Sequence, residues 1–235
     1  MGIADLHIHT IYSYDGTATI PAVLQRAQQA GLDLVAITDH DQIRGAWEAE
    51  QLAPKFGLQV LPGMEITTAE GDLLALAIRK PIPPGLSLME TIWRVGAQDG
   101  FCIAPHPGVN GLGMKSLSFA ALGRALCNQD IRRVLLGLET YNATALDRTG
   151  NLSAKIWAKQ LDVAQTGSSD AHVLGAIGLG TTFFPGKTPL DLVAALWMGT
   201  TRACQGSEWN PIQVLGSWAA NYLLSVPQHL SLALG

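Results

Sequence analysis

The stretch IADLHIHT at residues 3–10 is an apolar run that carries two histidines and one aspartate. In an extended chain, side chains two residues apart point to the same side, so His7 and His9 face one way. Two imidazoles at one strand end can bind a single cation. A lone His-x-His pair is weak evidence, because two partly exposed histidines on a strand edge give the same pattern. Its meaning depends on the residues that the rest of the chain places beside it.

Short apolar runs alternate with amphipathic segments along the chain. The predicted strands are Ile3–His9, Leu34–Thr38, Gln59–Pro62, Leu73–Ile78, Phe101–Pro105, Val134–Thr140, Asp162–Thr166 and Gly180–Phe184. The predicted helices are Ile20–Ala30, Gln42–Phe56, Ser87–Gln98, Leu117–Leu126, Asn151–Lys159 and Leu190–Gly199. Repeated strand–helix units indicate an α/β protein with a mainly parallel sheet. Seven or eight units in about 200 residues favour a closed or nearly closed barrel, with an open doubly wound sheet as the alternative.

Further histidines and carboxylates stand at or just after the ends of these strands. They are His40, Glu65, His106, Asp170 and His172. Because the carboxyl ends of parallel strands meet at one rim of a barrel, we expect these side chains to converge there, whereas His229 is predicted to be a surface residue. Histidine and carboxylate ligands together suit Zn, Mn or Fe. The sequence therefore predicts one multinuclear metal site.

These motifs together resemble a known family. The motifs HIH (7–9), TDH (38–40), PGME (62–65), HP (106–107) and SDAH (169–172) closely resemble the polymerase and histidinol phosphatase (PHP) superfamily. The resemblance covers roughly residues 3–205 and implies a distorted (β/α)7 barrel with up to three metal ions at the C-terminal ends of its strands. It implies these ligand sets: His7, His9, Glu65 and Asp170 for a first ion, Asp15, His40 and His172 for a second, and Glu65 with His106 for a third.

The third site departs from the family pattern. The family commonly has another histidine shortly after the glutamate, where this chain has Gly71-Asp72. Asp72 is therefore either a replacement ligand or a turn residue before a strand. The resemblance leaves two or three divalent ions, of Mn, Fe or Zn, as the expected cofactors.

The resemblance implies a metal-dependent phosphoesterase that hydrolyses small phosphomonoesters, such as a nucleotide or an amino alcohol phosphate, by a metal-activated water. Asp170 and His172 are the candidate catalytic residues, as proton donors to the leaving alkoxide. Lys115, Arg148 and Asn142 are the candidate substrate-binding residues. The alternatives are an exonuclease on short oligonucleotides, a non-catalytic metal-binding module and a hydrolase of a non-phosphate substrate such as an amide.

Charge and cysteine content limit the partners and the compartment. The net charge is −4, and the longest basic runs are the pairs Arg79-Lys80 and Arg132-Arg133. A protein that binds long nucleic acids usually carries a basic stripe, so we expect a small phosphorylated substrate and no long nucleic acid. The 3 cysteines are isolated, which fits a reducing compartment, and no signal peptide is predicted, so we expect a cytoplasmic protein.

The last residues differ in composition from the rest of the chain. From Trp209 to Gly235 there is no Asp, Glu, Lys or Arg, but polar residues and Pro227 interrupt the apolar run. A bilayer span needs about 20 predominantly apolar residues, so no membrane contact is expected. We predict a barrel domain at 1–205 and an apolar helical extension at 206–235, with a helix at roughly Pro211–Val226. That helix would pack on the barrel or on a second subunit, as in a homo-oligomer.

Overall fold

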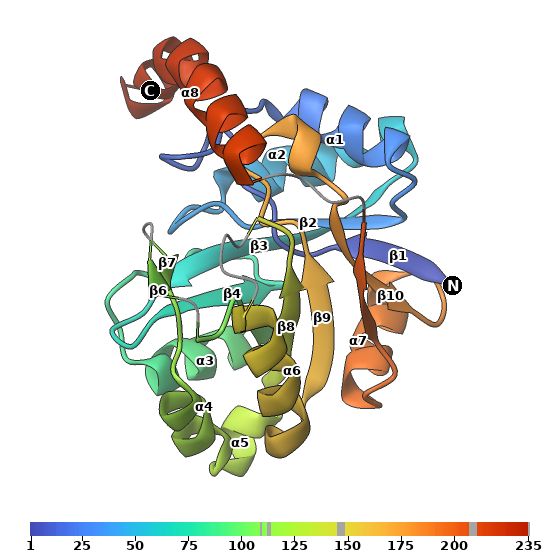
Figure 1. The fold of residues 1–235 in the computed structure, drawn as a ribbon, viewed down its shortest axis with the longest axis vertical. Coiled ribbons are helices and arrows are strands. Elements are labelled where there is room, and N and C mark those ends of the chain that lie inside the picture. The colour runs from blue at the N-terminus through green and yellow to red at the C-terminus, as the bar shows by residue number, and fades with distance from the viewer. Residues whose placement is uncertain (109, 112–113, 145–148, 207–210, 235) are drawn as a thin grey trace.

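Nine strands form one curved sheet in the part of the chain that the structure, a computed structural model, describes: residues 1–108, 110–111, 114–144, 149–206 and 211–234 (Figure 1). The strands lie in the order β11-β10-β1-β2-β3-β4-β5-β8-β9. Their bounds are β1 (Gly2–Asp5), β2 (Leu34–Ile37), β3 (Gln59–Thr67), β4 (Asp72–Leu76), β5 (Phe101–Ala104), β8 (Leu135–Asn142), β9 (Ala164–Ser168), β10 (Gly180–Phe184) and β11 (Arg202–Gln205). A small separate hairpin joins β6 (Asn110–Gly111) to β7 (Met114–Lys115).

The sheet nearly closes into the predicted seven-stranded barrel at the rim where β1 and β9 end. Just beyond β1, His9 N donates a hydrogen bond to the Ala171 carbonyl (2.9 Å), and Ala171 N donates to the His7 carbonyl (3.3 Å). These bonds bridge the segments that follow β1 and β9, so the ring runs from β1 through β2, β3, β4, β5 and β8 to β9. The two sequence motifs richest in candidate ligands therefore close the barrel.

Half of the strand pairings are antiparallel, which corrects the expectation of a mainly parallel sheet. β4 is antiparallel to both of its neighbours, and β10 is antiparallel to β1 and β11. Only residues 68–71 join β3 to β4, and a parallel connection needs a crossover of roughly a dozen residues. The hairpin lengthens β3 to Thr67, so Glu65 lies within a strand rather than after one.

The helices cover the outside of the barrel where the amphipathic patterns predicted them (Figure 1). Their bounds are α1 (Ile20–Gln29), α2 (Arg44–Leu52), α3 (Leu88–Gly96), α4 (Phe119–Leu126), α5 (Gln129–Arg132), α6 (Thr149–Leu161) and α7 (Pro189–Trp197), with short 3-10 turns at Ala53–Phe56 and Leu174–Ala176. The short helix α5 and the strand β11 were not predicted. One large buried apolar cluster, the main core, includes Val23, Ile37 and Ile92. A second cluster fills the barrel and includes Leu6, Ile103 and Phe184 together with Leu192 and Leu196 of α7. Because these side chains occupy the interior, polar chemistry is left to the rim.

The chain ends in a long helix, α8 (Pro211–Leu234), which projects beyond the rim (Figure 1). Trp218 packs against the main core, whereas Leu223 and Leu224 are largely exposed. No helix among the described residues combines the length and the apolar character that crossing a bilayer requires. The proposed boundary near residue 205 adjoins residues 207–210, which lie outside the described residues, and the division into a domain and an extension stays a prediction.

Candidate metal centre

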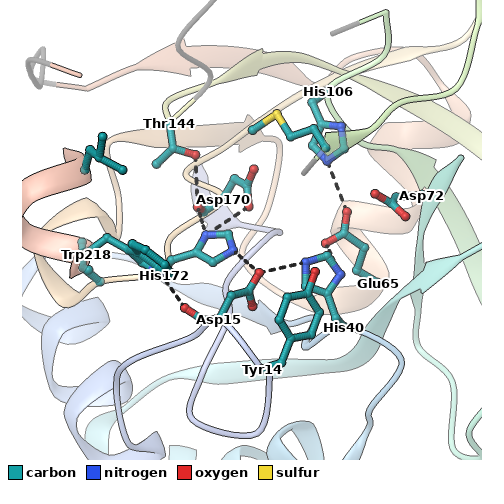
Figure 2. A pocket seen from close by; sticks show the side chains of 13 residues that line it. Tyr14, Asp15, His40, Glu65, Asp72, His106, Thr144, Asp170, His172 and Trp218 are labelled. Carbon is teal, nitrogen blue, oxygen red and sulfur yellow. Dashed lines mark hydrogen bonds and ion pairs between the residues drawn. The ribbon is translucent and has the colours of Figure 1, made fainter. Parts of the chain in front are cut away.

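The predicted ligands come from segments spread along the chain and meet at the rim of the barrel. Figure 2 shows those that line the cavity there. The predicted ligands arise just after β1, β2, β5 and β9, from within β3, and from the loop between β1 and α1. Three groups of side chains have ligand atoms that all lie within 4.8 Å of one another: His9, Asp15, His40 and His172; His7, Glu65 and His106; and His7, His9 and Asp170. Every ligand expected from the sequence, apart from Asp72, belongs to one of these groups.

Glu65 is the carboxylate that connects the groups. Its Oε2 atom lies 3.1 Å from His7 Nε2 and 3.3 Å from His9 Nε2, and its Oε1 atom lies 3.2 Å from His106 Nε2. His40 Nδ1 also lies 3.3 Å from Oε2. Four imidazoles therefore contact one carboxylate, which fits the bridging position that the family resemblance implies for Glu65.

Asp15 contacts two histidines, and Asp170 contacts His7, His9 and His172. Asp15 Oδ2 lies 3.1 Å from His172 Nε2 and 3.3 Å from His40 Nε2. Asp170 Oδ1 lies 3.2 Å from His9 Nε2 and 3.4 Å from His7 Nε2. Both carboxylates thus present oxygen atoms to the same region that the imidazoles face.

Most of the imidazoles are oriented through the ring nitrogen that does not face the centre. Nδ1 of His7 donates to Glu139 Oε1 (3.2 Å), and Nδ1 of His172 donates to the Asp170 carbonyl (2.9 Å). His106 Nδ1 hydrogen-bonds Ser116 Oγ (3.1 Å), and His9 Nδ1 lies 3.4 Å from Ser13 Oγ. Each arrangement leaves Nε2 free to face the centre, as metal-ligating histidines require.

Two features of the buried donor atoms indicate that the set fits a cation. His7 Nε2 and His9 Nε2 are 3.0 Å apart in a fully buried environment, where two lone pairs repel unless a proton or a cation lies between them. Buried polar atoms normally have a partner, yet Asp72 Oδ1 and His40 Nδ1 lack hydrogen bonds. Nitrogen and carboxylate donors in this number match the preferences of Zn, Mn and Fe.

The charges of the site shift pKa values in opposite directions. Burial alone would lower the pKa of His7, but Asp170 and Glu65 raise it well above its ordinary value. Burial would also lower the pKa of His172, but Asp15 raises it to about 9. Although burial would raise the pKa of Asp170, His7 holds it well below its usual range. Protons and metal ions therefore compete for the same atoms, and metal affinity should increase as the pH rises.

Backbone strain occurs at two of the ligand positions. His106 and Asp170 have φ angles of 31° and 52°, a left-handed conformation that non-glycine residues rarely adopt. Such strain persists where surrounding contacts fix the geometry, and it often marks functional sites. At His106 one such contact is a hydrogen bond from its backbone N to Glu139 Oε2 (2.8 Å).

A cavity of about 410 Å³ opens above these side chains. Its floor consists of polar side chains, and Figure 2 shows Trp218 at one edge beside His172. Asp72 also lines the cavity, while its Oδ2 atom accepts a hydrogen bond from Lys115 N (3.1 Å). Asp72 is the first residue of β4, where one of its oxygens anchors the β6–β7 hairpin and the other is buried without a hydrogen bond, so the anchoring role and the predicted role as a ligand are compatible.

The predicted substrate-binding residues have different surroundings. Asn142 is buried, and its Nδ2 atom donates to Asp170 Oδ2 (3.0 Å) and Glu139 Oε2 (2.9 Å). Lys115 is exposed and is absent from the described cavity lining. Arg148 lies outside the described residues. The three roles stay predictions.

Sequence reasoning missed several supporting residues. Ser13 accepts from His40 N (3.2 Å) and donates to Asp15 Oδ1 (2.6 Å), and Ser116 contacts His106. Their only sequence signal is proximity to a candidate ligand. Trp218 carries no such signal, since it lies 203 residues from its partner Asp15.

We expect Glu139→Gln to weaken Mn²⁺ binding about 10–100-fold, because Glu139 fixes His7 and the His106 backbone together. An amide can donate to or accept from His7 Nδ1, so the imidazole loses its single tautomer. Competition with a fluorescent chelator measures the change. Glu90→Gln, on the surface of α3, is the matched control and should bind as the wild type does. Equal affinities of the Glu139 variant and the wild type would show that Glu139 does not support the site.

Comparisons with known proteins identify the family of this chain. The PHP domain family model matches residues 5–151, and the PHP-associated model matches residues 148–201. An uncharacterized protein of Methanocaldococcus jannaschii is 37% identical over 150 residues, which cover 60% of this chain and 81% of that protein. A phosphoribosyl 1,2-cyclic phosphate 1,2-diphosphodiesterase of Eggerthella lenta is 40% identical over 87 residues, 34% of this chain and 33% of that enzyme.

A solved structure shares the fold over most of the chain. A two-domain protein of Bacteroides vulgatus, containing a predicted PHP-like metal-dependent phosphoesterase, superposes with a TM-score of 0.69 at 18% sequence identity. The match covers 93% of this chain and 69% of that one. Since the PHP domain model also spans more than half of the sequence, the protein belongs to the PHP domain family.

Proposed function

We propose that this protein hydrolyses small phosphomonoesters at the rim site, with two or three divalent ions of Mn, Fe or Zn as cofactors. The observation that carries the proposal is the convergence of imidazole and carboxylate donors, all within 4.8 Å in each group, six of which line one open cavity while His7 and His9 are buried. The proposed ligands are His7, His9, Asp15, His40, Glu65, His106, Asp170 and His172, with Asp72 at the third position.

Ions bound there would supply positive charge to the phosphoryl oxygens and make a coordinated water more acidic. The protein contributes fixed geometry. Glu139 and Asn142 hold His7 and Asp170 in place through buried hydrogen bonds, so little reorganisation is needed when a substrate binds. The chain thus acts through positioning and charge rather than through a side-chain nucleophile.

Asp170 and His172 are our candidates for delivering a proton to the leaving alkoxide. Both line the cavity, and His172 Nε2 faces Asp15 while its Nδ1 is held by the Asp170 carbonyl. His172 is partly exposed, whereas Asp170 is buried. Because a lone pair that binds a metal ion cannot also carry a proton, either residue would donate only from an atom that no ion occupies.

A phosphodiesterase, including an exonuclease on short oligonucleotides, is the second candidate. The similarity to the Eggerthella lenta diphosphodiesterase favours it. An oligonucleotide groove usually combines cationic and aromatic side chains. The described lining contains Trp218 and Tyr14 but no Lys or Arg, which supports the monoester. A non-catalytic module is less well supported, since the ligands expected for the first two ions are all present and lie close together.

Removing two ligands together should abolish both metal binding and turnover. We expect His7→Ala combined with His9→Ala to lose bound metal and to release phosphate from 4-nitrophenyl phosphate at least about a hundredfold more slowly. Metal analysis and phosphate release, measured on the same sample, test this. His229→Ala is the control, because His229 belongs to none of the described ligand groups. Full turnover by the double variant would exclude the proposed site.

Asp72→Asn should lower the number of ions bound per chain by one. The amide keeps the size of the side chain and can still accept from Lys115 N, but it offers the ion no charge. Metal counting by mass spectrometry of the native protein measures the stoichiometry. Asp130→Asn, at an exposed position on α5, should leave it unchanged. Equal metal counts in the Asp72 variant and the wild type would make Asp72 a turn residue alone.

The products separate the two candidate activities. We expect free phosphate from a nucleoside monophosphate at a rate at least about tenfold above nucleotide release from a short oligonucleotide, because the described cavity lining contains no Lys or Arg for a phosphate backbone. Chromatography of both reactions, at equal metal loading, gives the ratio. A higher rate on the oligonucleotide would instead favour the exonuclease.

A further inference from the structure

Helix α8 forms one wall of the cavity above the metal centre. Leu215 and Trp218, one turn apart on this helix, both line the cavity. Both lie beyond residue 201, where the match to the PHP-associated model ends. The wall therefore lies outside the residues that the two family models match.

Trp218 is held in place by three contacts. Its indole Nε1 donates a hydrogen bond to the Asp15 carbonyl (2.8 Å), its ring stacks on Tyr222 with centroids 5.0 Å apart, and its side chain packs against the main core. Figure 2 shows the ring beside His172, with the bond to Asp15 drawn. An aromatic surface that is fixed before a ligand arrives loses little entropy when the ligand binds.

The wall and the floor of the cavity differ in character. Val173 and Met114 join Leu215 and Trp218 as apolar lining, whereas the floor carries carboxylates and imidazoles. The described lining includes no Lys or Arg that would bind a second anionic group. A phosphate on the floor would therefore place the organic part of its ester against an apolar and aromatic surface.

We propose that α8 selects phosphate esters whose alcohol part is apolar or aromatic, with Trp218 and Leu215 as specificity-determining residues. This inference rests on the proposed function, because the phosphate end must occupy the rim site. It narrows the substrate class to esters that carry a single phosphate and an uncharged, hydrophobic or planar organic group.

Binding of phosphonates tests the wall without any turnover. We expect the Mn²⁺-loaded full chain to bind benzylphosphonate at least about tenfold more tightly than methylphosphonate in titration calorimetry, since the benzyl group covers apolar lining. Trp218→Ala should remove most of this preference, and Leu215→Ala should reduce it about threefold. Trp218→Phe should retain it, because an aromatic ring remains although the hydrogen bond to Asp15 is lost.

Two further measurements keep the outcomes distinct. Leu224→Ala, at a position of α8 that is 78% exposed, should leave both affinities unchanged. Equal binding of the two phosphonates by the wild type, or an unchanged preference in both Leu215→Ala and Trp218→Ala, would overturn the role of α8. If the preference holds but no ester releases phosphate, the proposed function fails and the wall assignment stands. If esters are hydrolysed and no preference exists, the wall assignment fails alone.

Discussion

The contact of one buried carboxylate with four imidazoles is the interaction on which the site depends. Glu65 is 1% exposed, and its two oxygens contact His7, His9, His40 and His106. Burying these groups one at a time would be costly, because each loses its hydration without compensation. Together they compensate one another's charge. Loss of this carboxylate would leave several buried imidazoles without their common partner.

The barrel makes this burial possible by bringing distant segments to one rim. The β3–β4 hairpin places Glu65 inside a strand, where two neighbouring strands fix its backbone. The hydrogen bonds between the His7–His9 and Ala171 backbones close the ring beside it. Since apolar side chains fill the barrel below, the polar groups have no other place to gather. Closure of the fold and assembly of the site therefore depend on the same few residues.

The sequence predicts that the candidate ligands meet at one rim, but it does not predict the strand directions and long-range contacts around them. The ligands follow strands whose apolar periodicity is local, so their positions at the rim can be inferred without knowing which strands are neighbours. The antiparallel direction of β4 depends on a four-residue connection that apolar periodicity does not report. Contacts such as His7 to Glu139, 132 residues apart, and Trp218 to Asp15 depend on tertiary packing. Apolar periodicity gives no information about such pairs.

Charge balance links the metal centre to the choice of substrate. Four carboxylates line the cavity, those of Asp15, Glu65, Asp72 and Asp170. Metal binding displaces the protons of the imidazoles beside them, and no Lys or Arg of the described lining offsets the carboxylate charge. Divalent cations held by the carboxylates would reverse the sign of the field at the floor. In the proposed function, the polar part of the cavity would then hold the phosphate group, and the apolar wall formed by α8 would discriminate between esters.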